Sequence, residues 1–284
     1  MLNKIINWAR KEDAIRAVLL TGSRVCSDQP DFFADYDITF FVTNVSTYLT
    51  DSSWIRAIGR VWVEIADKIC TLGQKEYHTR LVIFKGGLKA DFAFFTTDIL
   101  EDIETQGDLL LRFVRAYKVL LDKDGLTKVL RASVLKVPLA QKPTQEEFER
   151  VVKEFFFEAY HVAKYFYRNE LWQVKFRDWA AKEFLLRMIE WNEKAQHGWD
   201  YDTHYQGKKM QSWCNKEIWS VLNNCFARFD LEDSWKALMA TIGLFRDVAK
   251  QVAEHVDYEY PVSVDKNITD FVQKLLNKYF SKSI

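Results

Sequence analysis

The chain has 284 residues, which is enough for one large domain or two ordinary ones. Lys plus Arg and Asp plus Glu number 40 each, so the charge gives no long-range field that would favour a nucleic-acid polymer or an acidic membrane as partner. Aromatic residues make up 15% of the chain, which excludes a disordered or low-complexity protein and favours aromatic packing in the core and in any pocket.

The first half of the chain predicts a mixed β-sheet flanked by helices. Apolar periodicity predicts helices over residues 2–10 and 52–58 and strands over residues 17–21, 38–42 and 118–121. A Gly-Gly pair between two strand-like runs predicts a tight hairpin over residues 78–95. Asp91 is therefore expected inside a strand.

The second half of the chain predicts a helical bundle that begins after Pro138 and Pro143. Apolar residues recur there with the spacing of a helix that buries one face, and Thr144 with Glu147 forms a capping box at its start. Four more apolar stripes follow, over residues 181–188, 218–225, 235–245 and 268–275. The sequence thus predicts an α+β protein, with a sheet domain over residues 1–137 and an α-helical bundle domain over residues 138–284.

Two aspartates one residue apart, Asp35 and Asp37, begin the second predicted strand. Strand alternation places both carboxylates on one face, while Tyr36 points away. Such close carboxylates repel each other, and a divalent cation between them is the simplest way to keep them together. Asp91 completes the set if its strand pairs beside them. Three carboxylates suit two Mg²⁺ ions that bridge triphosphate oxygens and activate an attacking hydroxyl.

The Gly22-Ser23 turn, at the end of the first strand, provides a phosphate-binding group. Glycine permits a close backbone approach, and backbone N–H groups with the Ser23 hydroxyl can bind phosphate at the start of the next turn. Arg24 would add positive charge against the β- or γ-phosphate. Taken alone, an Asp-x-Asp pair is more often a loop or strand-edge feature. Its combination with the Gly-Ser turn and Asp91 favours a metal site.

A Gly-Ser pair followed twelve residues after the serine by Asp-x-Asp, with a third Asp on a later strand, resembles the polymerase-beta-type nucleotidyltransferase superfamily. The segments LLTGSR, DYDITFFVT and LLDKDG resemble, more narrowly, the aminoglycoside 6-adenylyltransferases, also called streptomycin adenylyltransferases. The resemblance extends to RNELW and LLRMIEW in the helical half and covers nearly the whole chain.

The resemblance implies transfer of AMP from ATP to a hydroxyl of an aminoglycoside such as streptomycin, with release of pyrophosphate, an activity of the antibiotic-resistance type. By position, Asp35 and Asp37 would bind both Mg²⁺ ions. Asp91 would bind one of them and help to deprotonate the acceptor, and Ser23 would hold the triphosphate. The family's helical domain closes over the nucleotide and shapes the acceptor site.

A polycationic acceptor calls for acidic and aromatic groups in the helical domain. Two glutamates and an aromatic-acidic loop are candidates: Glu154, Glu158, Trp199, Asp200, Tyr201 and Asp202. Three basic residues are candidates for triphosphate contact: Lys164, Lys182 and Arg187. A solvated helix face is the competing interpretation of the two glutamates, which lie four residues apart, and of the three basic residues.

Two alternative functions remain open from the sequence. The chemistry could act on another small-molecule, protein or RNA acceptor, although the balanced charge disfavours RNA. A non-catalytic nucleotide-binding relative is disfavoured because all three carboxylates and the Gly-Ser turn are intact. The four cysteines show no close spacing, no apolar signal segment opens the chain, and no apolar run approaches the ~20 residues of a membrane span. We expect a cytoplasmic monomer whose partners are ATP and a cationic acceptor.

Overall fold

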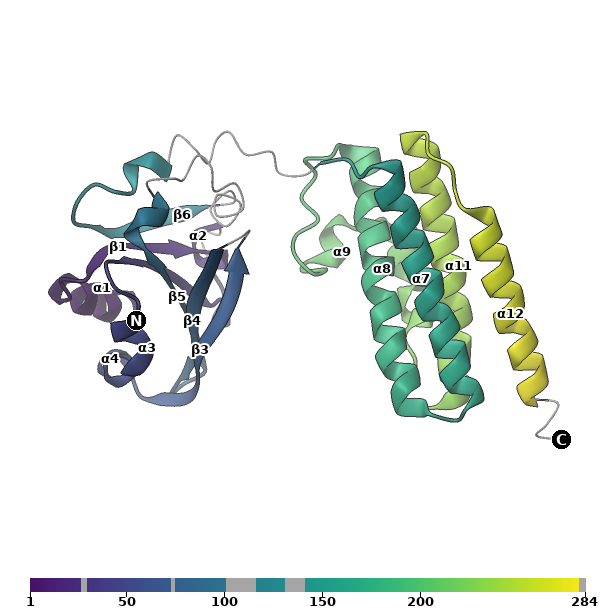
Figure 1. Ribbon diagram of the computed structural model, residues 1–284, viewed down its shortest axis with the longest axis horizontal. Coiled ribbons are helices and arrows are strands. Elements are labelled where there is room, and N and C mark those ends of the chain that lie inside the picture. Colours follow the sequence, from purple (N-terminus) through teal and green to yellow (C-terminus); the bar gives the residue numbers. More distant parts are fainter. Residues whose placement is uncertain (27–29, 73–74, 101–115, 131–140, 281–284) are drawn as a thin grey trace. The chain divides into compact units, whose positions relative to one another are not determined.

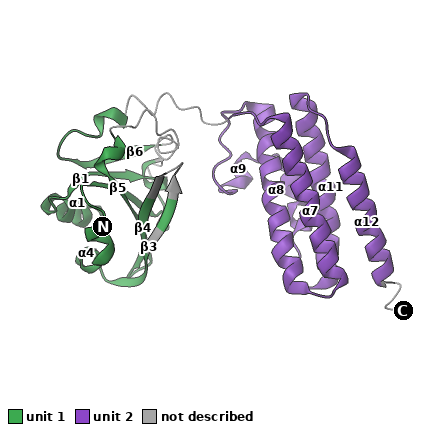
Figure 2. Ribbon diagram, in the orientation of Figure 1, with its two compact units in different colours: residues 1–139 green, residues 140–284 purple. Residues whose placement is uncertain are grey.

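The computed structural model describes residues 1–26, 30–72, 75–100, 116–130 and 141–280. The chain divides into two compact units, residues 1–139 and residues 140–284 (Figure 2). A β-sheet with short helices makes up the described part of the first unit, and helices make up that of the second (Figure 1). The predicted α+β class, with an N-terminal sheet and a C-terminal helical bundle, is therefore confirmed.

In the described part of the first unit, six strands form one sheet in the order β3-β4-β5-β2-β1-β6. Their bounds are β1 Ile15–Thr21, β2 Tyr36–Val42, β3 Val61–Leu72, β4 Lys75–Phe84, β5 Leu88–Thr96 and β6 Tyr117–Asp122. Strands β2 and β5 pair in parallel, whereas the other neighbours pair antiparallel, so the sheet is mixed. The parallel pair lies in the middle of the sheet.

The two faces of this sheet are buried in different ways. Three helices, α1 Leu2–Lys11, α3 Ser46–Thr50 and α4 Ser53–Ile58, contribute side chains to the core on one face, where Phe40 stacks on Phe94 with ring centroids 5.1 Å apart. Because strand neighbours point to opposite faces, Phe41 packs on the other face, in a smaller cluster completed by the 3-10 helix η1 (Thr97–Leu100). Of these two clusters of described residues, the smaller one lies on the same face as the aspartates described below.

The predicted strands and short helices of the first unit are confirmed, with ends that move by a few residues. The Gly-Gly hairpin is also confirmed: Gly86 and Gly87 have φ of +93° and +81° in the turn between β4 and β5. Strand β3 was not predicted. It is an edge strand in which the consecutive residues Trp62 and Val63 are both exposed, and its pairing with β4 has two register shifts. The strand therefore lacks the alternation of apolar and polar residues by which a half-buried strand is predicted.

The helical unit is built around four long helices. They are α7 Gln145–Tyr167, α8 Leu171–His197, α11 Leu231–Val256 and α12 Val262–Phe280, and the short elements α9 Met210–Trp213, α10 Lys216–Val221 and η2 Leu222–Cys225 lie between α8 and α11. In the core, Phe155 of α7 stacks on Phe245 of α11. The predicted capping box is present: Thr144 Oγ1 accepts from the Glu147 N–H, and the Thr144 N–H donates to Glu147.

Two of the predicted apolar stripes differ from the helices observed. The stripe over residues 181–188 lies inside α8, which begins ten residues earlier. The apolar pattern does not predict this beginning, because exposed Trp172, Phe176 and Trp179 add apolar residues on the face opposite the core and hide the helical period. The stripe over residues 218–225 is not one helix but α10 followed by η2. Among the described helices, none has the length and apolar character needed to cross a membrane.

Candidate active site

Two of the three predicted aspartates lie side by side in the middle of the sheet. Asp37 of β2 is opposite Thr21 of β1 on one side and opposite Asp91 of β5 on the other. Directly opposed residues of neighbouring strands point to the same face, so the two carboxylates share one face. Asp35 comes just before β2 and, two residues from Asp37, continues the alternation on that face. The parallel pairing of β2 with β5 thus brings the acidic residues together.

Gly22 provides the close approach between the first turn and the carboxylates. Its φ is +73°, and a Cβ atom at this position would lie 2.9 Å from Cγ of Asp37 and closer still to Oδ2. The Asp37 carboxylate therefore occupies the space that any side chain at Gly22 would need. Ser23 follows as the exposed first residue of the four-residue helix α2 (Ser23–Cys26). The Gly-Ser turn and Asp37 form one contiguous group.

Arg24 binds the segment that carries Asp35. Its Nε donates a hydrogen bond to the Ala34 carbonyl oxygen at 2.9 Å, and its guanidinium carbon lies 3.8 Å from the centroid of the Tyr36 ring. These partners are the residues on either side of Asp35 in the chain. In this structure Arg24 thus fixes the entry to β2, a contact that the sequence did not reveal.

Lys89 is a member of the site that the sequence analysis missed. Its Nζ donates to Asp35 Oδ2 at 2.7 Å and to Asp91 Oδ2 at 2.9 Å. Burial lowers the pKa of Lys89, but the hydrogen bonds and negative charges of Asp35 and Asp91 outweigh it, so the pKa is raised overall. The spacing could have indicated this residue, since Lys89 and Asp91 are two positions apart on one strand and share a face.

The carboxylate oxygens fit the ligand preferences of a divalent cation such as Mg²⁺. Asp91 Oδ1 is buried and has no hydrogen-bond partner in the described part of the chain, and Asp35 and Asp91 already share one cationic group. Over the same residues, no three His, Cys, Asp or Glu side chains are arranged as a complete metal site. Asp37 lies against Gly22, while the Lys89 ammonium lies between the other two carboxylates.

In the helical unit, two of the predicted charged residues are already paired. Glu158 of α7 accepts from Arg177 of α8 at 3.2 Å and 3.3 Å, whereas Glu154, one turn earlier, is exposed. Lys182 is buried and donates to Asp178 at 2.6 Å. The charges of Glu158 and Lys182 are therefore compensated inside this unit.

The remaining helical candidates differ in exposure. Arg187 is exposed, and Lys164 is half-buried with its Nζ 5.2 Å from the Tyr165 ring centroid. Trp199 and Tyr201 pack against the helical core, and the Tyr201 hydroxyl donates to the Trp213 carbonyl oxygen at 3.4 Å. Asp200 between them is exposed, as is Asp202. The two aromatic rings therefore contribute first to packing.

The two groups of predicted acceptor contacts lie far apart. Glu158 contacts α8 at Arg177, whereas the loop with Trp199 to Tyr201 follows the end of α8 at His197. At the rise of an α-helix, the roughly 20 residues between Arg177 and His197 span about 30 Å. The structure therefore places these two groups of predicted acceptor contacts at different ends of α8.

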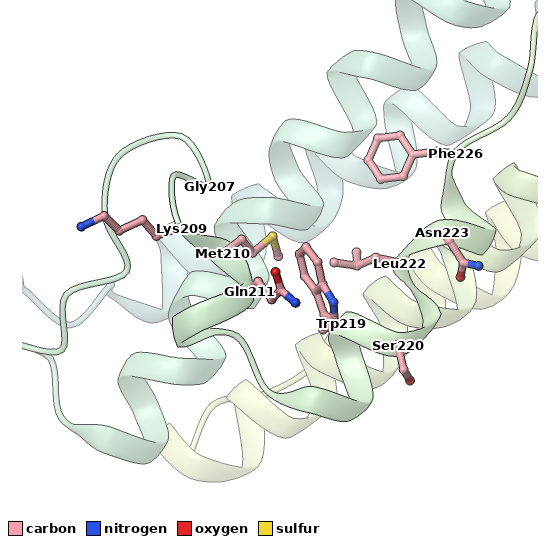
Figure 3. Close-up of a pocket in the computed structure, with 9 residues that line it drawn as sticks. All are labelled: Gly207, Lys209, Met210, Gln211, Trp219, Ser220, Leu222, Asn223 and Phe226. Atoms are coloured by element: carbon pink, nitrogen blue, oxygen red, sulfur yellow. The ribbon is translucent and has the colours of Figure 1, made fainter. Parts of the chain in front are cut away.

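A pocket of about 710 Å³ opens beside α9 and α10 (Figure 3). Nine residues line it: Gly207, Lys209, Met210, Gln211, Trp219, Ser220, Leu222, Asn223 and Phe226. The predicted acceptor and triphosphate residues are not among them. The lining lacks a carboxylate, so this pocket is poorly suited to a polycation.

The mixed sheet places the Gly22-Ser23 turn against Asp37, beside Asp91 on the adjoining strand, which is the arrangement expected of a nucleotidyltransferase. The family model described as streptomycin adenylyltransferase matches residues 1–275, and the chain belongs to this family. The suspected family relationship and the enzyme class are thereby confirmed.

Curated relatives agree with the family assignment. The aminoglycoside 6-adenylyltransferase of Campylobacter jejuni is 28% identical over 286 residues, covering 97% of this chain and 94% of the relative. That of Bacillus subtilis (strain 168) is 28% identical over 278 residues, covering 96% of this chain and 95% of the relative. A crystal structure of an aminoglycoside 6-adenyltransferase from Bacillus subtilis aligns with a TM-score of 0.49 and 24% identity, over 97% of each chain.

Proposed function

We propose that this protein transfers AMP from ATP to a hydroxyl group of an aminoglycoside, in a Mg²⁺-dependent reaction that releases pyrophosphate. The observation that carries the proposal is the contact of Asp37 with the Gly22 turn, in register beside Asp91. The names of the curated relatives support an aminoglycoside acceptor, and streptomycin is the first candidate. We further propose that the protein works as a monomer in the cytoplasm, where ATP is available.

The chain's own residues would divide the work as follows. The backbone and hydroxyl groups of Gly22 and Ser23 bind the triphosphate of ATP, because this turn permits close approach and offers hydrogen-bond donors. Asp35, Asp37 and Asp91 would hold two Mg²⁺ ions. When bound, Mg²⁺ would neutralise triphosphate oxygens and lower the pKa of the attacking hydroxyl.

Bond making and breaking take place at the α-phosphorus of ATP. The acceptor hydroxyl oxygen forms a bond to this atom, and the bond to the oxygen that bridges the α- and β-phosphates breaks, so pyrophosphate leaves with the electron pair. The hydroxyl proton must move to a base. We assign this role to Asp91, because its carboxylate lies in register beside Asp37 at the proposed metal site.

On the helical unit, we propose Glu154 as the acceptor contact, with Glu158 in support. Glu154 is exposed, whereas the charge of Glu158 is partly compensated by Arg177. An exposed carboxylate can pair with an ammonium or guanidinium group of a polycationic acceptor. Lys164 and Arg187 are proposed as alternative triphosphate contacts, because Lys164 lies near the start of α8 whereas Arg187 lies about 16 residues into that helix, about 24 Å along it. The third basic candidate, Lys182, is buried against Asp178.

Replacing Glu154 with Gln should raise the KM for the acceptor a few-fold, the equivalent of about 1 kcal/mol for one exposed ion pair. The kcat and the KM for ATP should not change, because Glu154 is not among the residues proposed to bind ATP or the metal ions. Steady-state kinetics with each substrate varied in turn measures this. Glu254→Gln, an equally exposed change on α11, is the matched control.

Asp200→Asn serves as the comparison at the far end of α8. Because Asp200 follows the end of α8 that lies away from the contact between Glu158 and Arg177, we expect only one of the two substitutions to affect a small acceptor. A rise in acceptor KM for Asp200→Asn alone would move the acceptor site to the Trp199–Tyr201 loop. An unchanged KM for both would assign Glu154 to the solvated helix face.

The proposed reaction is tested by mass spectrometry of the purified protein with ATP, Mg²⁺ and a panel of acceptors led by streptomycin. An AMP adduct on streptomycin is the expected result. An adduct on another hydroxylated acceptor would keep the chemistry and replace the acceptor. Absence of an adduct on every acceptor, with ATP unconsumed, would contradict the proposed transfer.

A further inference from the structure

Lys89 lies between two carboxylates that a metal ion would also use. Strand pairing of Tyr36 with Ala90 places Asp35 beside Lys89, and the alternation of β5 places Asp91 on the same face. The Lys89 ammonium is 2.7 Å from Asp35 Oδ2 and 2.9 Å from Asp91 Oδ2. The Lys89 side chain therefore links β5 to the residue that precedes β2, through one oxygen of each carboxylate.

The arrangement compensates charge that would otherwise be repulsive. The side chains of Lys89, Asp35 and Asp91 are 37%, 35% and 27% exposed, so solvent screens their interactions only in part. Two carboxylates sharing one ammonium leave a net charge of −1, and Asp37 adds a further carboxylate in register with Asp91. Without Lys89 the same oxygens would face each other without a positive partner, which is unfavourable for like charges.

We propose that Lys89 is the internal counter-ion of this carboxylate site and that a divalent cation must displace its ammonium group in order to bind. The inference rests on the proposed metal-dependent function. Asp35 Oδ2 and Asp91 Oδ2 cannot coordinate a metal ion at full strength while they accept hydrogen bonds from Lys89. Lys89 acts as a positioning residue that holds the carboxylates in place before the metal arrives.

Displacement gives Lys89 a second role in the timing of metal binding. The lysine side chain is a flexible chain with a compact charge, so its ammonium can leave the carboxylates without movement of β5. Triphosphate is an alternative anionic partner for the freed ammonium. Metal binding is therefore weakened when nucleotide is absent and favoured when it is present, which couples the two ligands.

The test compares Mn²⁺ binding by nucleotide-free wild type and Lys89→Met, with free Mn²⁺ measured by electron paramagnetic resonance. Removal of the competing charge should lower the Kd for Mn²⁺ about tenfold. This change corresponds to a modest part of the Coulomb energy between two unit charges at this distance near a protein surface. Lys89→Arg keeps the charge and should remain near wild type. Lys118→Met is the matched control, because Lys118 is exposed on β6 and pairs with Leu20, whose side chain belongs to the opposite face.

A second measurement does not depend on Mn²⁺ affinity. In EDTA, Lys89→Met should melt at a lower temperature than wild type, and saturating Mg²⁺ should remove most of that difference. If wild type binds Mn²⁺ as tightly as Lys89→Met or more tightly, the proposed role of Lys89 is wrong, whereas the proposed metal site is retained. Failure of both proteins to bind Mn²⁺, with or without ATP, would instead reject the metal-dependent function.

Discussion

Replacing Asp37 with Asn should abolish AMP transfer while the protein stays folded. Asn has nearly the same shape, so it can occupy the space against Gly22, but it lacks the negative charge that binds a metal ion. Enzymes lose up to about 100-fold in activity when a residue that hydrogen-bonds to a metal ligand, without touching the metal, is replaced. Asp37 is proposed as a direct ligand, so its replacement should lower kcat by more than this. Turnover of ATP and acceptor, measured with saturating Mg²⁺ and beside a thermal melting curve, checks both parts of this result.

The control for this substitution is Asp98→Asn in the 3-10 helix η1. Asp98 is exposed and does not belong to the group formed by Asp35, Asp37 and Asp91. Its replacement by Asn therefore makes the same change in net charge, but away from the site. Its kcat should equal that of wild type. Substantial Mg²⁺-dependent turnover by Asp37→Asn would remove Asp37 from the proposed metal ligands.

Replacing Gly22 with Ala should cost both stability and activity. The new methyl group would overlap the Asp37 carboxylate, and a φ of +73° is itself strained for alanine. Backbone strain of this kind costs of order 1–3 kcal/mol. Because Asp37 must move to make room, transfer should fall to near the level of Asp37→Asn. Denaturant unfolding and single-turnover transfer measure the two effects separately.

Gly86→Ala separates backbone strain from collision with the carboxylate. Gly86 also has a positive φ, +93°, but a Cβ atom there would meet nothing within 4 Å. This variant should lose stability and keep its activity. If Gly22→Ala also kept its activity, the contact between the turn and Asp37 would have no part in catalysis.

Local sequence patterns predicted those parts of the fold that local interactions determine. The Gly86-Gly87 turn and the capping box at Thr144 are examples, because a few neighbouring residues specify each of them. Strand β3 and the first turns of α8 were missed, since exposed aromatic residues on both elements obscure the periods on which such predictions depend. The parallel pairing of β2 with β5 is a tertiary contact that no local pattern specifies.

The site was predictable in its residue types but not in its internal contacts. The spacing of Asp35 and Asp37 and the strand position of Asp91 indicated that three carboxylates could meet. The roles of Lys89 and Arg24 depend on cross-strand distances that the sequence does not contain. In the helical unit, Lys182 follows Asp178 by four residues and lies beside a buried stripe position, so its ion pair could have been foreseen.

The central parallel strand pair also affects how the site appears during protein synthesis. Asp35 and Lys89 are 54 positions apart, and the chain between them forms β3 and β4. A growing chain that has exposed β1 and β2 therefore already carries Asp35 and Asp37 but lacks the strand that supplies Asp91 and the bridging lysine. The Gly22-Ser23 turn and Asp37 can meet once β1 and β2 have paired, but Asp91 joins them only after β5 has entered the sheet. A nascent chain therefore passes through its early stages without the complete group of carboxylates.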